Sequence, residues 1–197
     1  MIETLGLVAG SGWASGLNLY LSVLMLGFAQ RLGWAELPEV LARTDVMIVA
    51  GVLFLVEFLA DKVPYLDNLW DAIHTFIRPA GAAALGSVLA GDSGSIGAAL
   101  GAVIGGGLAL DAHAAKATTR VVANTSPEPF SNIALSVVED IGVALLVVLA
   151  VAHPVVAVIV VAVLVVAATA LTVWLWRMAR RSWRRIRKQG WLRQGQG

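Results

Sequence analysis

The hydrophobic residues of this chain fall into six apolar segments separated by short polar stretches. A helix that crosses a membrane needs about 20 apolar residues, because each residue adds about 1.5 Å along the helix axis. The pattern therefore predicts an all-α membrane protein with about six transmembrane helices. The expected segments are 5–28, 46–60, 76–89, 96–117, 133–152 and 154–176.

The six segments differ in how clearly they predict a transmembrane helix. The stretch 142–176 carries no acidic or basic side chain apart from His153, so its second part predicts a transmembrane helix on hydropathy alone. The segments 46–60 and 76–89 are short for a full crossing, and Pro79 lies near the start of the latter. These two are compatible with re-entrant or broken helices, which a membrane tolerates only where protein or a cavity covers the backbone.

The composition agrees with a membrane location. The chain is 58% hydrophobic and 14% charged, whereas soluble domains are about 45–50% apolar and about 25% charged. A length of 197 residues suits one domain. The absence of cysteine excludes disulfides and thiolate metal sites. The start of the chain lacks a basic region, so we expect the first segment to be a retained span rather than a cleaved signal peptide.

Charge divides the chain into a membrane domain, 1–176, and a basic tail, 177–197. Eight of the fourteen basic residues lie between Arg177 and Arg193, which leaves six against thirteen acidic residues in the membrane domain. Basic segments next to transmembrane helices stay in the cytoplasm. The tail is therefore expected on the cytoplasmic side of the cell (inner) membrane, and six crossings would place the N-terminus there too.

A weak internal similarity predicts two inverted three-helix repeats, 5–90 and 96–176. Leu37-Pro38-Glu39 precedes the segment that contains Glu57, and Ser126-Pro127-Glu128 precedes the segment that contains Glu139. Inverted repeats are typical of secondary transporters, whose sites lie between the repeats. Glu57 and Glu139 would then approach each other near the axis that relates the halves.

Several acidic side chains fall inside the apolar segments, where each charge costs about 2.5–3.5 kcal/mol on insertion scales. Glu57 and Asp61 lie four residues apart on one helical face, and Glu139 and Asp140 follow six uncharged residues of the fifth segment. One interpretation is a solvated helix end with Lys62 as a neighbour. The other is a site that holds a cation or a proton between carboxylates.

The fourth segment ends with a basic helical face formed by His113, Lys116 and Arg120. This face is explained either by contact with lipid phosphates or by binding of an anion or relay of a proton. Lys116 or Arg120 is also a plausible partner for Glu139. Asp111 points away from that face and is expected to pair with another helix. Asn18 is a buried amide in the first segment, for which hydrogen bonding between helices is the simplest role.

An amphipathic helix is predicted between the second and third segments. Its polar positions recur at helical spacing, whereas leucine, isoleucine and tryptophan occupy the other side. This pattern predicts a helix that lies at the inner membrane surface. The spacing of two carboxylates and an imidazole resembles a metal-binding face, but further ligands are lacking, so we expect no metal and no cofactor. The polar positions are Asp67, Asp71, His74 and Arg78.

Four stretches of this sequence resemble an uncharacterised family of small prokaryotic integral-membrane proteins, filed as a domain of unknown function. The stretches are GWASGLNLY (12–20), EFLADKVPYLD (57–67), WDAIHTFIRP (70–79) and SPEPFSN (126–132). The resemblance implies a membrane fold and a length close to that of this chain. It implies no activity.

The sequence therefore favours a small transporter or channel for an ion or small solute. Glu57 and Glu139 would bind the proton or cation, while Arg78, Lys116 and Arg120 would neutralise these acids or face an anionic group. The alternative is a lipid or polyprenyl-phosphate translocase that uses the same basic face. A membrane enzyme acting on lipid phosphates is less favoured, since the phosphotransferase and phosphatase motifs are missing.

A scaffold whose basic tail binds anionic lipid is the simplest remaining function. The expected partners are the lipid bilayer and an ion or small solute. The glycine stripes of the first and fourth segments permit a homodimer. No nucleic acid is expected.

Overall fold

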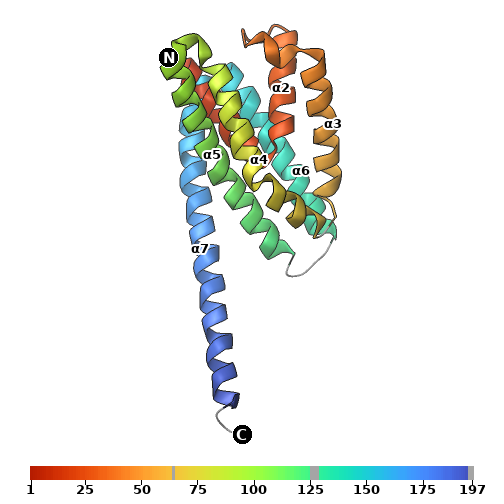
Figure 1. Ribbon diagram of the computed structural model, residues 1–197, viewed down its shortest axis with the longest axis vertical. Coiled ribbons are helices and arrows are strands. Elements are labelled where there is room, and N and C mark those ends of the chain that lie inside the picture. The colour runs from red at the N-terminus through yellow and green to blue at the C-terminus, as the bar shows by residue number, and fades with distance from the viewer. Residues whose placement is uncertain (64, 125–128, 195–197) are drawn as a thin grey trace.

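The computed structural model describes residues 1–63, 65–124 and 129–194, with backbone alone for 129, 131 and 182–194. The described chain is all helical, as predicted, with seven α-helices and two short 3-10 helices (Figure 1). In chain order these are α1 (Ile2–Leu17), α2 (Leu19–Arg31), η1 (Glu39–Ala42), α3 (Thr44–Ala60), α4 (Leu66–Leu89), η2 (Gly91–Ser93), α5 (Gly94–Ala123), α6 (Pro129–Ala152) and α7 (Pro154–Gln194).

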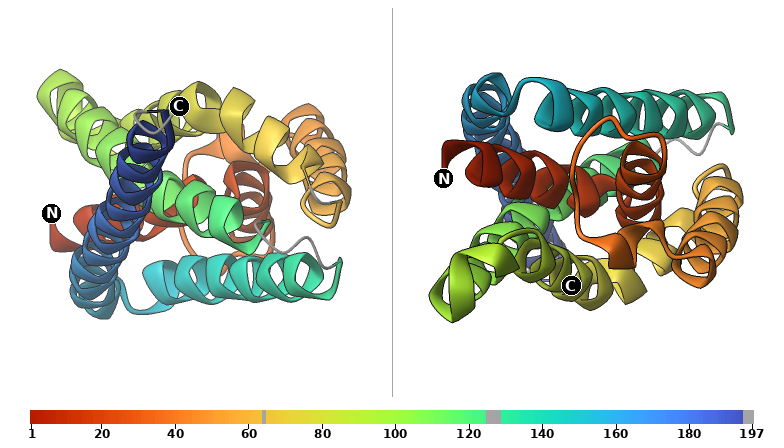
Figure 2. Two further views of the ribbon diagram at one scale, coloured as in Figure 1. Left: turned by 90° about the horizontal axis from the view of Figure 1, so that it is seen from below. Right: turned by 90° about the horizontal axis from the view of Figure 1, so that it is seen from above.

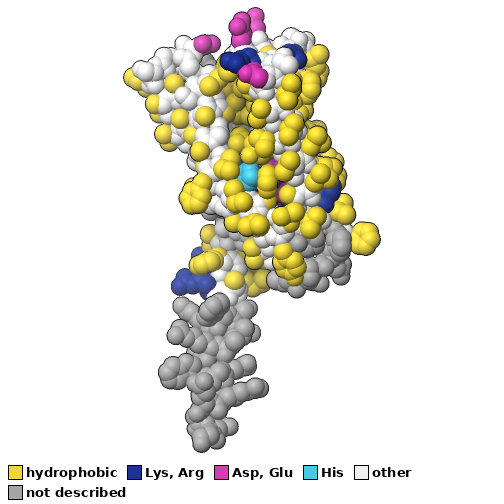
Figure 3. Space-filling model, turned by 45° about the vertical axis from the view of Figure 1, so that its right-hand side comes forward, with side chains coloured by type: hydrophobic (Ala, Val, Ile, Leu, Met, Phe, Trp, Pro, Cys, Tyr) yellow, Lys and Arg dark blue, Asp and Glu magenta, His cyan; other side chains and the backbone are white. Residues whose placement is uncertain are grey.

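Three stretches of the described chain are long and apolar enough to cross a membrane: Gly91–Ala123, Asn132–Ala152 and Pro154–Arg181. Many large hydrophobic side chains on these helices point outward; Val103 and Val166, for example, are 73% and 70% exposed. On the face drawn in Figure 3, hydrophobic side chains cover much of the described surface below the charged upper end. A surface of this kind needs lipid rather than water around it.

The central helix of the bundle is α1. Seen from above, it lies between α6 on one side and α4 and α5 on the other (Figure 2). Many of its residues are glycine, alanine or serine, which allows its backbone to approach its neighbours closely. A Cβ atom at Gly12 would lie 2.8 Å from the Cα atom of Gly105, and one at Gly10 would lie 2.5 Å from the Cβ atom of Ala150. The first glycine stripe is therefore used in packing within the chain.

The first apolar segment, predicted as one span over 5–28, consists of two helices in the structure. Helix α1 ends at Leu17, and Asn18 has an extended backbone (φ −148°, ψ 99°). The Asn18 side chain accepts a hydrogen bond from the backbone N–H of Leu21 and so caps the start of α2. The break thus lies in the first segment, and not in the second or third, where the sequence led us to expect it.

The break turns the chain back on itself. Gly6 packs against Pro154 at the start of α7, and Gly16 packs against Ala109 half-way along α5. Helix α2 then returns, since Met25 and Ala29 line one pocket with residues at the end of α6. The start of α1 and the lower end of α7 consequently lie at opposite ends of the molecule (Figure 1).

Helix α4 combines the expected surface helix and the third segment into one continuous helix that contains Pro79. Its polar residues are buried, while Phe76 on the other side is 80% exposed. The predicted surface helix is therefore wrong in orientation, because its polar face turns into the bundle and its apolar face turns outward. The buried polar residues are Asp67, Asp71, His74 and Arg78.

The two predicted repeats do not contain the same elements. Residues 5–90 form four α-helices, α1 to α4, whereas 96–176 lie in three, α5 to α7. The second Pro-Glu pair, Pro127-Glu128, lies outside the described residues. The structure gives no support to an inverted repeat.

Helix α7 is the longest element, and its lower part extends beyond the rest of the bundle (Figure 1). At 41 residues it measures about 60 Å, roughly twice the hydrocarbon thickness of a bilayer. Trp174 and Trp176 are exposed about 20 residues after its start and are followed by Arg177. Tryptophan next to arginine is typical of the membrane interface. Of the basic tail, the side chains described are those of Arg177, Arg180 and Arg181.

Candidate functional site

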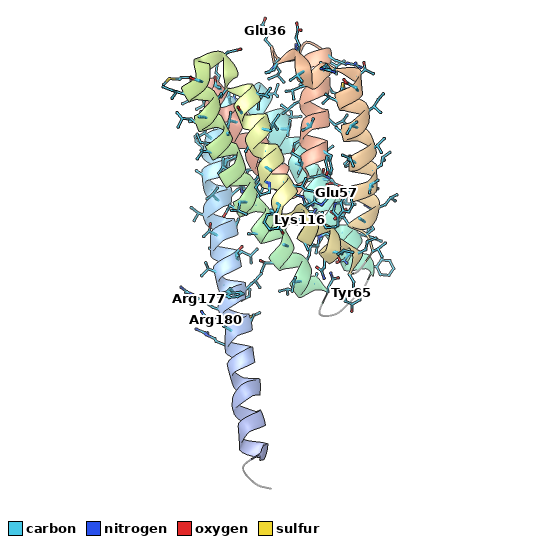
Figure 4. All side chains as sticks on the ribbon, in the orientation of Figure 1. Glu36, Glu57, Tyr65, Lys116, Arg177 and Arg180 are labelled. Atoms are coloured by element: carbon cyan, nitrogen blue, oxygen red, sulfur yellow. The ribbon has the colours of Figure 1, made fainter. Side chains whose placement is uncertain are left out.

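A cluster of buried charged side chains lies in the interior of the bundle. It joins four successive α-helices, α3, α4, α5 and α6, and Figure 4 shows Glu57 and Lys116 pointing into this interior. We call it the charge cluster and define it by its ion pairs. Its basic members are Arg78, Lys116 and Arg120, and its acidic members are Glu57, Asp61, Asp67, Asp71 and Glu139.

Arg78 connects α4 to α3 and α5. Its Nη2 donates to Glu57 Oε1 at 2.8 Å, and its Nη1 donates to Asp71 Oδ1 at 3.0 Å. The same Nη1 lies 2.7 Å from His113 Nδ1 and 3.4 Å from the carbonyl oxygen of Gly16. The Arg78 side chain is completely buried. An arginine in this position requires such partners, because a buried charge without them costs several kcal/mol.

Lys116 occupies the centre of the cluster. Its Nζ lies 2.7 Å from Asp61 Oδ2, 3.3 Å from Glu139 Oε2 and 3.6 Å from Glu57 Oε1. It also donates to the carbonyl oxygen of Leu17, at the break between α1 and α2. The predicted pairing of Glu139 with a basic residue of α5 is confirmed. Glu57 and Glu139 approach each other through this shared lysine.

Arg120 lies one turn further along α5. Its Nη2 donates to Glu139 Oε2 at 2.7 Å and to Asp61 Oδ2 at 3.2 Å. Its Nη1 donates to the backbone carbonyl oxygen of Asp61 and lies 3.7 Å from Asp67 Oδ2. Arg120 therefore fixes the end of α3 against α5 and α6.

Asp67 is held mainly by amides. Asn124 Nδ2 donates to both carboxylate oxygens, at 3.0 and 2.9 Å, and Asn132 Nδ2 lies 3.3 Å from Oδ2. Asn132 Nδ2 also donates to Asn124 Oδ1 at 2.9 Å. Asn124 follows the end of α5 and Asn132 lies in the first turn of α6, so Asp67 ties these two helix ends to the start of α4.

Two histidines lie at the edge of the cluster with their rings oriented by neighbours. His74 Nδ1 is 2.8 Å from the carbonyl oxygen of Trp70, which can only accept, so this nitrogen carries the proton. His74 Nε2 then accepts from the Tyr20 hydroxyl at 2.9 Å.

His113 has the opposite arrangement. Its Nδ1 faces Arg78, which can only donate, and its Nε2 lies 3.1 Å from Thr75 Oγ1. The Thr75 hydroxyl itself donates to the carbonyl oxygen of Asp71. Both histidines are thus hydrogen-bonded as neutral rings.

Three of the predicted site residues, Asn18, Asp140 and Asp111, form contacts outside the charge cluster. Asp140 Oδ1 accepts from Asn18 Nδ2 at 3.0 Å, which confirms an interhelical hydrogen bond for that buried amide. Asp111 Oδ1 accepts from Thr169 Oγ1 of α7 at 2.7 Å, and Asp111 Oδ2 lies 3.4 Å from Trp13 Nε1 of α1. The expected pairing of Asp111 with another helix is therefore confirmed, at a distance from the charge cluster along α5.

The acidic members outnumber the basic ones, five to three, within the described chain. Four buried carboxylate oxygens also have no hydrogen-bond partner among the described residues: Glu57 Oε2, Asp61 Oδ1 and Asp71 Oδ2 in the cluster, and Asp140 Oδ2 outside it. An excess of two buried negative charges is costly. The described ion pairs therefore leave the cluster with more carboxylates than basic groups. No group of three or more His, Asp or Glu side chains suited to a metal ion occurs in the described residues.

Sequence analysis identified every charged member of the cluster, although it placed Asp67, Asp71 and Arg78 at the membrane surface. It assigned no interior contact to Tyr20, Asn124 or Asn132. A signal was present in each case, because Tyr20 lies two residues after a buried amide and both asparagines flank a proline-rich connection. Polar residues at such places are candidates for interior contacts.

The fold and the cluster together define a class: an all-helical protein with helices able to span a membrane and with buried ion pairs in its interior. More particularly, the chain belongs to the family described as "Domain of unknown function (DUF4126)", whose sequence profile matches residues 5–176. The resemblance seen in the sequence is confirmed. No curated protein and no solved structure matches the chain.

Proposed function

We propose that this protein is a small membrane transporter or channel in which the charge cluster holds a proton or cation and couples it to the movement of an ion or small solute. The observation that carries the proposal is the excess of buried carboxylates over buried basic groups in the membrane interior. Intramembrane ionisable residues are costly and typically mark ion pathways and proton relays.

The arrangement of Glu57 supports a change of state. One of its oxygens is held by Arg78, while the other is buried and has no hydrogen-bond partner in the described part of the chain. Addition of a proton to that oxygen would neutralise the carboxylate and weaken its attraction for Arg78 and Lys116. These two basic groups would then shift toward Asp71 and Asp61, and the contacts between α3, α4 and α5 would change.

The alternative of a lipid or polyprenyl-phosphate translocase has less support. Arg78, Lys116 and Arg120 are buried, and each already pairs with at least two carboxylates. A phosphate would have to displace these carboxylates to reach them. The same pairing disfavours an enzyme acting on lipid phosphates.

We further propose a membrane arrangement in which α3 to α7 cross the bilayer and α1 and α2 form a re-entrant pair. Helices of 16 and 13 residues are about 24 and 20 Å long, too short to cross alone. The basic C-terminal tail is proposed to lie in the cytoplasm, which places the protein in the cell membrane.

The proposal is tested in liposomes that contain the purified protein and a pH-sensitive dye. The wild-type protein should dissipate an imposed proton or cation gradient, and Glu57→Gln should reduce the rate at least tenfold because it removes the titrating oxygen. Glu36→Gln is the matched control, since Glu36 is exposed in the connection between α2 and α3.

Equal rates for Glu57→Gln and wild type, with both inserted, would contradict the proposed role of the cluster. Translocation of a fluorescent lipid by the wild type, with no ion movement, would favour the alternative.

A further inference from the structure

A pocket opens between α2, α3 and α4, above the charge cluster. It has a volume of about 370 Å³. Asp45, at the beginning of α3, lies at one end of it, and Tyr20 is among its lining residues. Asp45 pairs with Arg43, and both side chains are 62% exposed, so this end of the pocket faces water.

Two of the helices that line the pocket, α3 and α4, carry charge-cluster residues about one helical turn away from their lining residues. On α3, Leu53 lines the pocket, and Glu57 follows four residues later on the same face. On α4, Gly81 lines the pocket, and Arg78 precedes it by three residues. The pocket therefore leads toward the ion pair between Glu57 and Arg78.

Tyr20 separates the pocket from the cluster. It lines the pocket, and its hydroxyl donates to His74 Nε2 inside the bundle. The ring of Tyr20 meets the ring of His74 edge-on, with 5.7 Å between centroids. Because the His74 ring is fixed by Trp70, it positions the tyrosine at the bottom of the pocket.

From this geometry we infer that the pocket, whose polar lining residues are Asp45 and Tyr20, is the path by which a proton reaches Glu57, with Tyr20 as the residue that closes its inner end. The inference rests on the proposed function. The proton comes from a hydronium ion in the pocket, and Glu57 Oε2 takes it to form a neutral carboxyl group and release water.

A proton fits this site better than a metal cation. The described residues offer no group of three acidic or imidazole side chains that could hold a metal ion. The two neighbouring histidines are already hydrogen-bonded as neutral rings, whereas Glu57 has a buried oxygen without a partner among the described residues. The charged and titratable groups that act on Glu57 are Arg78, Lys116, Asp61, Asp71 and Tyr20.

The absence of cysteine from the chain allows a direct test. Leu53→Cys puts one thiol in the pocket, and Val52→Cys puts one on the lipid-facing side of α3 at the same depth, where Val52 is 55% exposed. A charged, water-soluble thiosulfonate should label Leu53→Cys at least tenfold faster than Val52→Cys, because it does not enter lipid. Val46→Cys, nearer the outer end of the pocket, replaces Leu53→Cys if that variant does not fold.

Labelling of Leu53→Cys should also slow proton movement at least fivefold, and labelling of Val52→Cys should not. Equal labelling of the two thiols, or no labelling of the pocket thiols, would overturn the access path. These results would not contradict the proposed function if Glu57→Gln still abolished proton or cation flux. Fast labelling of Leu53→Cys with undiminished proton flux would also overturn the path, since it would place the proton elsewhere.

Discussion

At the level of single residues, the molecule places strongly polar side chains where the surroundings are apolar. The free-energy cost of burying these charges is reduced because each basic group of the cluster has several partners. Arg120, for example, reaches two carboxylates and a backbone carbonyl oxygen within 3.2 Å. Such a network also makes its members depend on one another, since removing one charge leaves the others unbalanced.

Lys116 should be the member whose loss is most damaging. Lys116→Ala leaves Asp61 without its closest partner and removes the positive charge shared by Glu57 and Glu139. Breaking a buried ion pair in this way typically costs about 3–5 kcal/mol. The free energy of unfolding in detergent micelles should fall by about that amount.

Arg43→Ala provides the comparison, because the pair between Arg43 and Asp45 is exposed. It should change the free energy of unfolding little. Similar losses for the two variants would mean that the charge cluster is solvated rather than buried.

At the level of elements, the contact between α4 and α5 depends on glycine. Gly86 and Gly101 face each other so closely that a Cβ atom on either would collide with the carbonyl oxygen of the other. Backbone atoms cannot move aside as a flexible side chain can. The helices would have to separate, and the charge cluster below them joins the same two helices through Arg120 and Asp67.

Gly101→Ala should therefore destabilise the protein by about 1–3 kcal/mol, the usual cost of overpacking. Gly107→Ala, in the same helix, is the matched control, because a Cβ atom there meets nothing within 4 Å. Alanine also favours helix over glycine, so the control should unfold at the wild-type temperature or above it. Equal melting temperatures for the two variants would show that α4 and α5 do not touch at these glycines.

The elements show where sequence reasoning worked and where it failed. The starts of α5, α6 and α7 were predicted within four residues, because long apolar runs determine them, whereas α5 and α7 continue as helices beyond the predicted apolar segments. The orientation of α4 was predicted wrongly, because amphipathicity reveals two faces but not which face meets water. In a membrane the apolar face turns outward, and the partners that satisfy Arg78, such as Glu57 and His113, come from distant parts of the chain.

The break at Asn18 was missed for a similar reason. Hydropathy averages over a window, and one amide in an apolar run of about 24 residues hardly lowers that average. What ends α1 is a local effect, namely the extended backbone of Asn18 and the cap that its side chain gives to α2. The site residues could be predicted because a charged residue inside an apolar segment is visible in the sequence. Their pairing could not be predicted, because it depends on how the helices are arranged in space.

At the level of the whole molecule, the proposed re-entrant pair of α1 and α2 changes the side of the membrane expected for the N-terminus. The sides expected for the other parts of the chain stay the same. Six spans and the proposed five spans both place the connections around residues 36 and 92 outside and the basic tail inside. They differ only at the N-terminus. The positive-inside pattern cannot distinguish the two arrangements, because α1 begins without a basic residue.

The N-terminus is therefore the decisive position. A reporter that is active only in the cytoplasm should be active when fused after residue 197 and inactive when fused before residue 1. Fusions at residues 36 and 92 should be inactive in either arrangement, and so they show that the reporter senses sidedness. An active reporter at the N-terminus would mean that α1 and α2 cross the bilayer as one unit. Lys116 would then lose its contact with the carbonyl oxygen of Leu17, which exists because the helix ends there. Sidedness at one terminus thus tests both the fold and the surroundings of the central lysine.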